Sequence, residues 1–173
     1  MSIGKRELLA RGLHWSGVTS VLHNLPPKNS LLVLNYHRIG QPDNEMFDPG
    51  VFSATGDELN EHLIYLRRHT LPVTLSEAKA FCQGTLKDRA PRCRVLLTFD
   101  DGYLDNYQIA FPILRSQDLQ GVFFLTTSLI GTCAVPWWDY IAFSIKTARR
   151  RQIRLSYPSN LDVDLAANGV AKS

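Results

Sequence analysis

The sequence predicts an α/β fold with mainly parallel strands, arranged as an incomplete, deformed (β/α) barrel. Three short apolar runs predict strands, at residues 31–36, 95–99 and 122–125, and helical patterns separate them. The runs lack the apolar-polar alternation of a half-exposed strand, so we expect strands buried on both faces. Strands that alternate with helices favour a parallel sheet.

Two threonine-glutamate pairs have the spacing of a capping box, Thr55 with Glu58 and Thr74 with Glu77. The first pair is expected to open a helix that ends near residue 68. This helix carries leucines at helical intervals, namely Leu59, Leu63 and Leu66. The second pair is expected to open a short helix that stops at Gly84.

Two further helices are expected after the second strand. One spans about Asp105 to Gln117, and Pro112 disturbs its middle because proline cannot donate a helical hydrogen bond. The other starts near Pro136 and continues to about Arg154. Basic residues cluster in and after this helix, which we interpret as a solvated helix face, with an anionic lipid or polymer contact as the alternative. They are Lys146, Arg149, Arg150, Arg151 and Arg154.

The N-terminal 28 residues are expected to form a helical extension of a domain that occupies residues 29–173. A loosely amphipathic helix is predicted over residues 5–24, and Pro26 and Pro27 end it. Packing on the domain is the favoured role of this helix. A membrane-interface helix and a partner helix are the alternatives.

Composition is that of a globular protein, with 45% hydrophobic and 20% charged residues. The formal net charge of +3 is too small to predict nucleic-acid binding. The sequence has no apolar leader and no apolar stretch of the roughly eighteen residues that a membrane span needs. We therefore expect a cytoplasmic protein, with peripheral membrane contact left open. Three cysteines without C-x-x-C spacing predict reduced, mostly buried thiols, at Cys82, Cys93 and Cys133.

Two adjacent carboxylates, Asp100 and Asp101, directly follow the second apolar strand, and Gly102 then turns the chain. In α/β folds, chemistry gathers at the carboxyl ends of the strands. Like charges held this close favour a divalent cation. One carboxylate can ligate the metal while the other accepts a proton from its bound water. The alternative is a simple turn with an Asx hydrogen bond.

Four segments in order resemble the polysaccharide deacetylase family, which has the NodB homology fold. Along the chain they are Y-H-R-I at 36–39, T-F-D-D-G at 98–102, V-F-F-L at 122–125 and W-W-D at 137–139. The resemblance implies hydrolysis of an N-acetylated polysaccharide, with Asp100 as catalytic base and Asp101 as a ligand of a divalent metal, most simply zinc.

One signature of that family is missing here, the histidine pair H-[ST]-x-x-H-P that completes the metal site. The chain has five histidines, but none follows Asp101 and none has another four residues later. The resemblance therefore implies the N-terminal portion of a truncated domain. A catalytic zinc takes about three protein ligands, so we expect the chain alone to be inactive.

Four more residues are candidates for substrate binding. His37 could contact the substrate or an oxyanion, with a structural strand-end histidine as the alternative. Tyr103 could line the pocket beside the acidic pair. Trp137 and Trp138 could stack on a sugar face, with burial in the core expected for at least one of them.

Two other functions stay open on the residues alone. The first is a non-catalytic remnant that keeps part of the fold. The second is a receiver-like signalling module that binds Mg²⁺ at an acidic pair. A receiver also needs an acceptor aspartate after a later apolar strand, and Asp105, Asp118 and Asp139 do not follow one.

Overall fold

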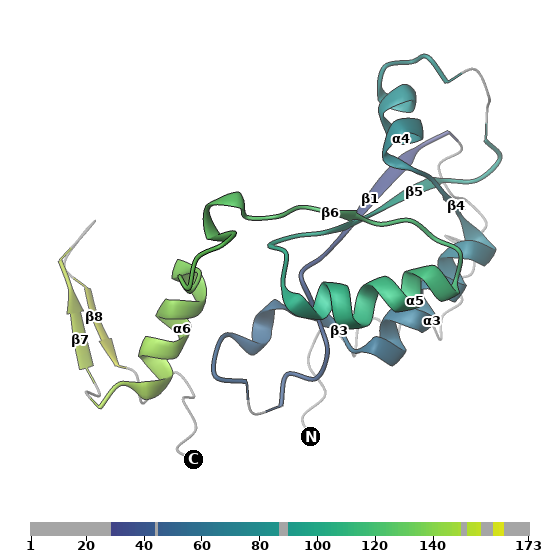
Figure 1. The fold of residues 1–173 in the computed structure, drawn as a ribbon. Helices are drawn as coiled ribbons and strands as arrows, with labels where there is room; N and C mark the ends of the chain where they lie inside the picture. Colours follow the sequence, from purple (N-terminus) through teal and green to yellow (C-terminus); the bar gives the residue numbers. More distant parts are fainter. Residues whose placement is uncertain (1–28, 44, 87–89, 150–151, 157–160, 165–173) are drawn as a thin grey trace, which may run out of the picture.

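The computed structural model describes residues 29–43, 45–86, 90–149, 152–156 and 161–164. A parallel sheet lies at its centre, with β5 (Arg94–Phe99) as the middle strand (Figure 1). β1 (Leu31–Tyr36) pairs with β5 along its whole length. On the other flank, β4 (Leu71–Pro72) pairs with the start of β5 and β6 (Val122–Phe123) with its end. The predicted parallel α/β sheet is confirmed, and the described residues show an open sheet rather than a barrel.

All six residues of β5 are buried, as expected for a strand covered on both faces. Val95, Leu97 and Phe99 project from one face into the main core. Leu96 projects from the other face into a smaller cluster with Val73 and Ala78. Because β5 is the best-covered strand, it gives a rigid base to the acidic residues that follow it.

The helix α3 (Gly56–His69) supplies much of the main core. Its capping box is formed as predicted, because the Thr55 hydroxyl accepts from Glu58 N–H while the Glu58 carboxylate accepts from Thr55 N–H. The leucines predicted for its apolar face are buried, Leu59, Leu63 and Leu66. The second capping box likewise opens α4 (Leu75–Cys82), and the chain leaves this helix through Gly84 at φ +68°.

The predicted helix around Pro112 is present but irregular. A π-helical turn, Asn106–Ala110, precedes α5 (Phe111–Ser116), and Phe111 N–H donates to Asn106 O. A proline ring crowds the carbonyl four residues earlier, and a wider turn is one way for a helix to accommodate it. In Figure 1, α3 and α5 lie side by side below the sheet.

The connections and the C-terminal region complete the fold. A short parallel pair, β2 (Arg38–Ile39) with β3 (Phe52–Ala54), follows β1. Single 3₁₀ turns occur before β3 and after β6, at Pro49–Val51 and Thr127–Leu129. The helix α6 (Trp137–Thr147) stands apart from the sheet in Figure 1, with the β7–β8 hairpin (Gln152–Leu155 and Leu161–Asp164) beyond it.

Two strand predictions were partly wrong. β1 is not buried on both faces, because Leu32 is 46% and Val33 52% exposed. The helices cover β5 and leave β1 at the margin of the sheet. β6 is also shorter than predicted, ending at Phe123, and Phe124 and Leu125 are exposed even though Phe124 N–H still donates to Phe99 O.

The last predicted helix was too long, because α6 ends at Thr147 and residues 152–155 form β7. The sequence Q-I-R-L alternates polar and apolar residues and pairs antiparallel with the similarly alternating L-D-V-D of β8. Arg154 is therefore on a strand rather than a helix face. The prediction of mostly buried thiols was also wrong, because Cys82 and Cys133 are exposed and Cys93 is half-buried.

The N-terminal extension, with its predicted helix over residues 5–24, lies outside the described residues. So do Arg150 and Arg151 of the basic cluster. In the part of the chain that the structure describes, no helix is both long and apolar enough to cross a membrane.

Candidate functional site

The carboxyl ends of β1, β5 and β6 meet at one edge of the sheet, where the acidic pair lies. Asp100 follows β5, and its backbone N–H donates to the carbonyl of Tyr36 at the end of β1 over 2.9 Å. The side-chain amide of Asn35 donates to Asp100 Oδ2 over 2.8 Å. The Thr98 hydroxyl donates to Asn35 Oδ1 over 2.9 Å and so fixes the orientation of that amide. Asp100 is thus held in place from the neighbouring strand.

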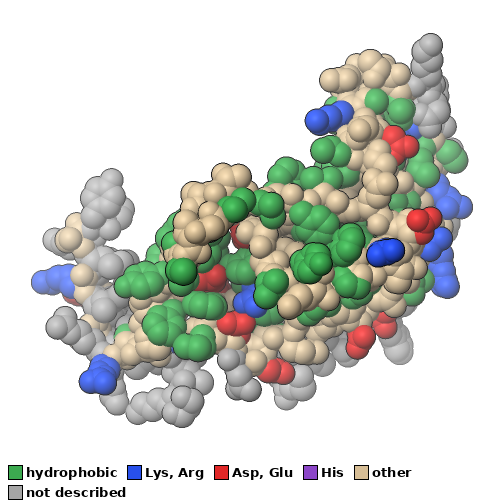
Figure 2. Space-filling model, viewed as in Figure 1, with side chains coloured by type: hydrophobic (Ala, Val, Ile, Leu, Met, Phe, Trp, Pro, Cys, Tyr) green, Lys and Arg blue, Asp and Glu red, His purple; other side chains and the backbone are tan. Residues whose placement is uncertain are grey.

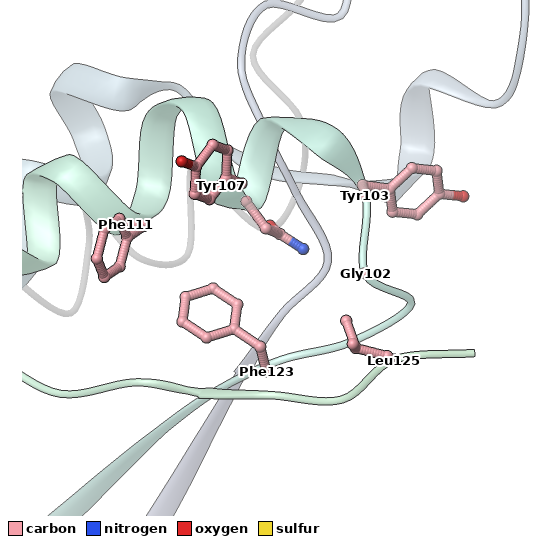
Figure 3. Close-up of a pocket in the computed structure, with 7 residues that line it drawn as sticks. Gly102, Tyr103, Tyr107, Phe111, Phe123 and Leu125 are labelled. Atoms are coloured by element: carbon pink, nitrogen blue, oxygen red, sulfur yellow. The ribbon is translucent and has the colours of Figure 1, made fainter. Parts of the chain in front are cut away.

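The chain turns sharply immediately after Asp100. Asp101 and Gly102 have consecutive left-handed conformations, with φ +71° and +69°. Aspartate tolerates this region better than most residues, whereas a side chain at Gly102 would also meet Leu125. A Cβ there would lie 2.7 Å from Leu125 Cδ2, and Figure 3 shows Leu125 directly beneath Gly102. The turn breaks the alternation of the strand and carries Asp101 onto a cavity wall.

A cavity of about 610 Å³ lies beside this turn. Asp101, Tyr103 and Asp139 supply its polar wall. The rest of the lining is mostly apolar. It comes from Gly102 and Leu104 beside the acidic residues, and from Phe47, the 125–130 segment and the 134–136 segment. The cavity therefore offers an acidic group at the edge of an apolar surface.

Tyr103 links the turn formed by Asp101 and Gly102, called the acidic turn below, to α6. Its hydroxyl donates to Asp139 Oδ2 over 2.9 Å and accepts from Trp138 Nε1 over 2.8 Å. Burial raises the pKa of the Tyr103 phenol above its ordinary range, and the nearby carboxylates add to the shift. Burial also raises the pKa of Asp139, which is only 2% exposed. The phenol therefore stays protonated and remains a hydrogen-bond donor at neutral pH.

Arg38 holds together two carboxylates near the acidic turn, Asp105 and Glu45. Its guanidinium donates to Asp105 and to Glu45, each over 2.9 Å, and lies 5.0 Å from the centre of the Tyr103 ring. It also lies 4.2 Å from the centre of the Phe52 ring. Burial alone would lower the pKa of Arg38, but the two carboxylates together outweigh burial and raise it. Arg38 thus stays charged and joins β2, the acidic turn and the loop around Glu45.

The other predicted site residues lie at the end of β1 and at the start of α6. His37 directly follows β1, whose last residue, Tyr36, pairs with Phe99, and the His37 backbone N–H donates to Ser53 Oγ over 2.9 Å. Trp137 is 70% exposed. Trp138 is half-buried, and the two indole rings meet edge to face at 5.6 Å.

The described residues do not assemble a complete metal centre. Within them, no group of three or more His, Cys, Asp and Glu side chains is arranged to hold a metal ion. Asp101 could supply one ligand, whereas a catalytic zinc takes about three from the protein.

Four residues of this site did not stand out in the sequence as site residues: Asn35, Arg38, Thr98 and Asp139. Asn35 carried a usable signal, because a polar residue near the end of an apolar run lies close to the carboxyl edge of the sheet. Asp139 carried a weaker one, as an acid within an aromatic helical segment.

Fold and site together define an α/β protein with an acidic pair at the carboxyl edge of a parallel sheet. Residues 87–154 match the family model described as polysaccharide deacetylase. A poly-beta-1,6-N-acetyl-D-glucosamine N-deacetylase from Staphylococcus epidermidis is 31% identical over 115 residues, which cover 61% of this chain and 39% of that protein. A protein of the same name from Escherichia coli K12 is 28% identical over 146 residues, 82% of this chain and 21% of that protein.

Among solved structures, IcaB from Ammonifex degensii matches with 32% identity and a TM-score of 0.49, over 60% of this chain and 41% of that one. The chain spans well under half the length of these relatives. Residues 87–154 are thus similar to part of a polysaccharide deacetylase domain.

Proposed function

We propose that this chain provides the acidic half of the active site of a deacetylase that removes acetyl groups from an N-acetylated polysaccharide. One observation carries the proposal: Asp100, held by Asn35, precedes Asp101 in a left-handed turn, within a segment that matches the polysaccharide deacetylase family. The curated relatives named above, both N-deacetylases of poly-N-acetylglucosamine, support that substrate class.

Asp100 is the proposed general base. The hydrogen bond from Asn35 orients its carboxylate without protonating it, so the group can accept a proton from an attacking water. Asp101 is proposed as one ligand of a divalent metal, most simply zinc. The remaining ligands would have to come from outside the described residues, because those residues do not complete a metal centre.

His37, Tyr103, Trp137 and Trp138 are the proposed substrate contacts. Trp137 suits a sugar-stacking role best, because its indole is 70% exposed. Tyr103 acts from the cavity wall, and its hydroxyl is already engaged by α6. His37 directly follows β1, as Asp100 directly follows the paired strand β5.

A non-catalytic remnant is the second candidate, and the incomplete metal centre favours it. A chimera separates the two functions: residues 29–164 replace the matching region of the Staphylococcus epidermidis deacetylase, and acetate release from a β-1,6-linked N-acetylglucosamine oligomer is measured. We expect release above background, and about 10²–10⁴-fold less with Asp100→Asn. A folded chimera that binds zinc but releases no acetate would overturn the proposal.

A further inference from the structure

The helix α6 is attached to the rest of the site at both of its ends. At its start, Asp139 and Trp138 both bond to the Tyr103 hydroxyl. At its end, Lys146 Nζ donates to the backbone carbonyls of Glu45, over 2.8 Å, and of Phe47. The helix α6 stands apart from the sheet in Figure 1. These polar contacts therefore hold it in place together with the Phe47–Phe143 ring contact, whose centroids lie 6.4 Å apart.

The most deeply buried side chain of α6 is a carboxylate, which is unusual for a surface helix. Asp139 is the one buried residue of this helix, whose side chains are all described. Three apolar residues of the helix are exposed, with Trp137 at 70%, Tyr140 at 63% and Ile141 at 48%. The other apolar residues are only half-buried, namely Trp138, Ala142, Phe143 and Ile145. Figure 2 shows hydrophobic side chains gathered on this side of the molecule. A surface helix normally buries an apolar stripe, so the buried carboxylate calls for an explanation.

Stability alone does not explain Asp139. A carboxylate loses its hydration when it is buried, and an apolar side chain of similar volume is often equally stable or more so. Asp139 also keeps one oxygen, Oδ1, buried without a hydrogen-bond partner in the described structure. The other oxygen accepts a hydrogen bond from the Tyr103 hydroxyl, the one hydrogen bond of this carboxylate to a side chain among the described residues.

The hydrogen bond between Tyr103 and Asp139 connects the turn at Asp101 and Gly102 to the aromatic pair Trp137 and Trp138. Tyr103 is two residues beyond Asp101. The Arg38 guanidinium lies 5.0 Å from the centre of its ring and supports the ring on that face. Asp139 and Trp138 then fix the first turn of α6 to the same hydroxyl. Trp137 follows, because its ring packs edge to face on Trp138 at 5.6 Å.

We propose that Asp139 is a positioning residue that acts through Tyr103, fixing the Trp137–Trp138 pair beside the acidic turn so that Trp137 receives the pyranose ring of an N-acetylated sugar. The sugar-binding part rests on the proposed function. The anchoring part rests on the hydrogen bonds and burial of Asp139 and does not depend on catalysis.

The anchor is tested in the 173-residue chain by ¹⁵N NMR of the Trp138 indole N–H, assigned with Trp138→Phe. In Tyr103→Phe, the resonance shifts and its hydrogen exchange accelerates about tenfold, as expected for loss of one hydrogen bond. Asp139→Leu moves the resonance in the same direction while the melting temperature stays level or rises. Asp139→Asn retains an acceptor oxygen and restores the wild-type resonance. Tyr107→Phe is the matched control, because Tyr107 is 71% exposed on the following turn.

Sugar binding is measured on the same samples by titration with a β-1,6-linked N-acetylglucosamine oligomer. We expect Kd to rise about fivefold in Asp139→Leu and Tyr103→Phe, about the loss of one hydrogen bond, and to stay unchanged in Tyr107→Phe. An indole resonance unmoved by Tyr103→Phe and Asp139→Leu overturns the anchor, and equal affinities overturn its link to sugar. If the resonance responds but the wild-type chain binds no oligomer, the proposed function fails while the anchor is supported.

Discussion

The Asn35 side-chain amide donates to Asp100 Oδ2 over 2.8 Å and thereby joins the ends of two adjacent parallel strands. Thr98 lies on β5, two residues before Asp100, and its hydroxyl donates to Oδ1 of the same asparagine. The register of β1 on β5 sets this arrangement, because Asn35 pairs with Thr98. A shift of one residue would turn the amide to the opposite face of the sheet. The orientation of the proposed base is therefore a property of the strand pairing.

Replacing Asn35 should impair catalysis more than folding. In the chimera, Asn35→Leu is expected to lower acetate release about 10- to 100-fold, because a hydrogen bond to a charged group contributes about 1.5–3 kcal/mol. Release is compared at equal folded fraction, checked by circular dichroism. Asn60→Leu serves as control, because Asn60 bonds Gln117 on the helical layer. An unchanged rate in Asn35→Leu would show that Asp100 needs no support from β1.

Alanine substitutions at two glycines with nearly equal φ, Gly84 and Gly102, distinguish the cost of backbone strain from the cost of steric crowding. Gly84 has φ +68° with open space where a Cβ would stand, whereas the Cβ at Gly102 would lie 2.7 Å from Leu125 Cδ2. Gly84→Ala should cost about 1–2 kcal/mol, the strain of a left-handed alanine. Gly102→Ala should cost more in urea denaturation, and Leu125→Ala in the same chain should recover part of the difference. Equal costs at both positions would contradict the close approach of Leu125.

The capping box of α3 predicts a pH-dependent stability. The hydrogen bond from Thr55 N–H, aided by the Thr55 hydroxyl, lowers the pKa of the Glu58 carboxyl. A carboxyl whose pKa is lower in the folded state stabilises the fold above its unfolded pKa, about 4.3 for glutamate, and loses that effect as pH falls through the folded value. Glu58→Gln should therefore reduce the free energy of unfolding at pH 7 and make little difference at pH 3. A difference that is the same at both pH values would contradict this role.

Arg38 should contribute far more to stability than an exposed arginine in a similar ion pair. Its guanidinium bonds Asp105 and Glu45 with side chains at most 17% exposed, so Arg38→Met leaves two carboxylates without their cation. We expect a loss of about 2–4 kcal/mol in chemical denaturation. Arg154→Met is the control, because its partner Asp162 is 70% exposed, and its loss should stay below about 1 kcal/mol. Similar losses in both variants would argue against an organising role for Arg38.

The sequence alone predicted the elements whose causes are local. A capping box lies within four residues, so the starts of α3 and α4 could be read from Thr55 and Thr74. The apolar runs located β1 and β5, and the acidic pair followed β5 as expected. The end of α6 was missed, because α6 and the alternating pattern of β7 lie only a few residues apart and both are rich in apolar residues.

Tertiary structure decided how the site is held together. Asn35 and Asp100 are 65 positions apart, Arg38 and Asp105 are 67 apart, and Tyr103 and Asp139 are 36 apart. Periodicity and capping patterns describe neighbours within a few residues and say nothing about such pairs. The sequence by itself determined which carboxylates stand at the end of β5. Only the pairing of β1 with β5 decided that Asn35 orients Asp100, and only the position of α6 decided that Asp139 bonds Tyr103. Hydrogen bonds of this kind require two distant segments to be brought to within about 3 Å.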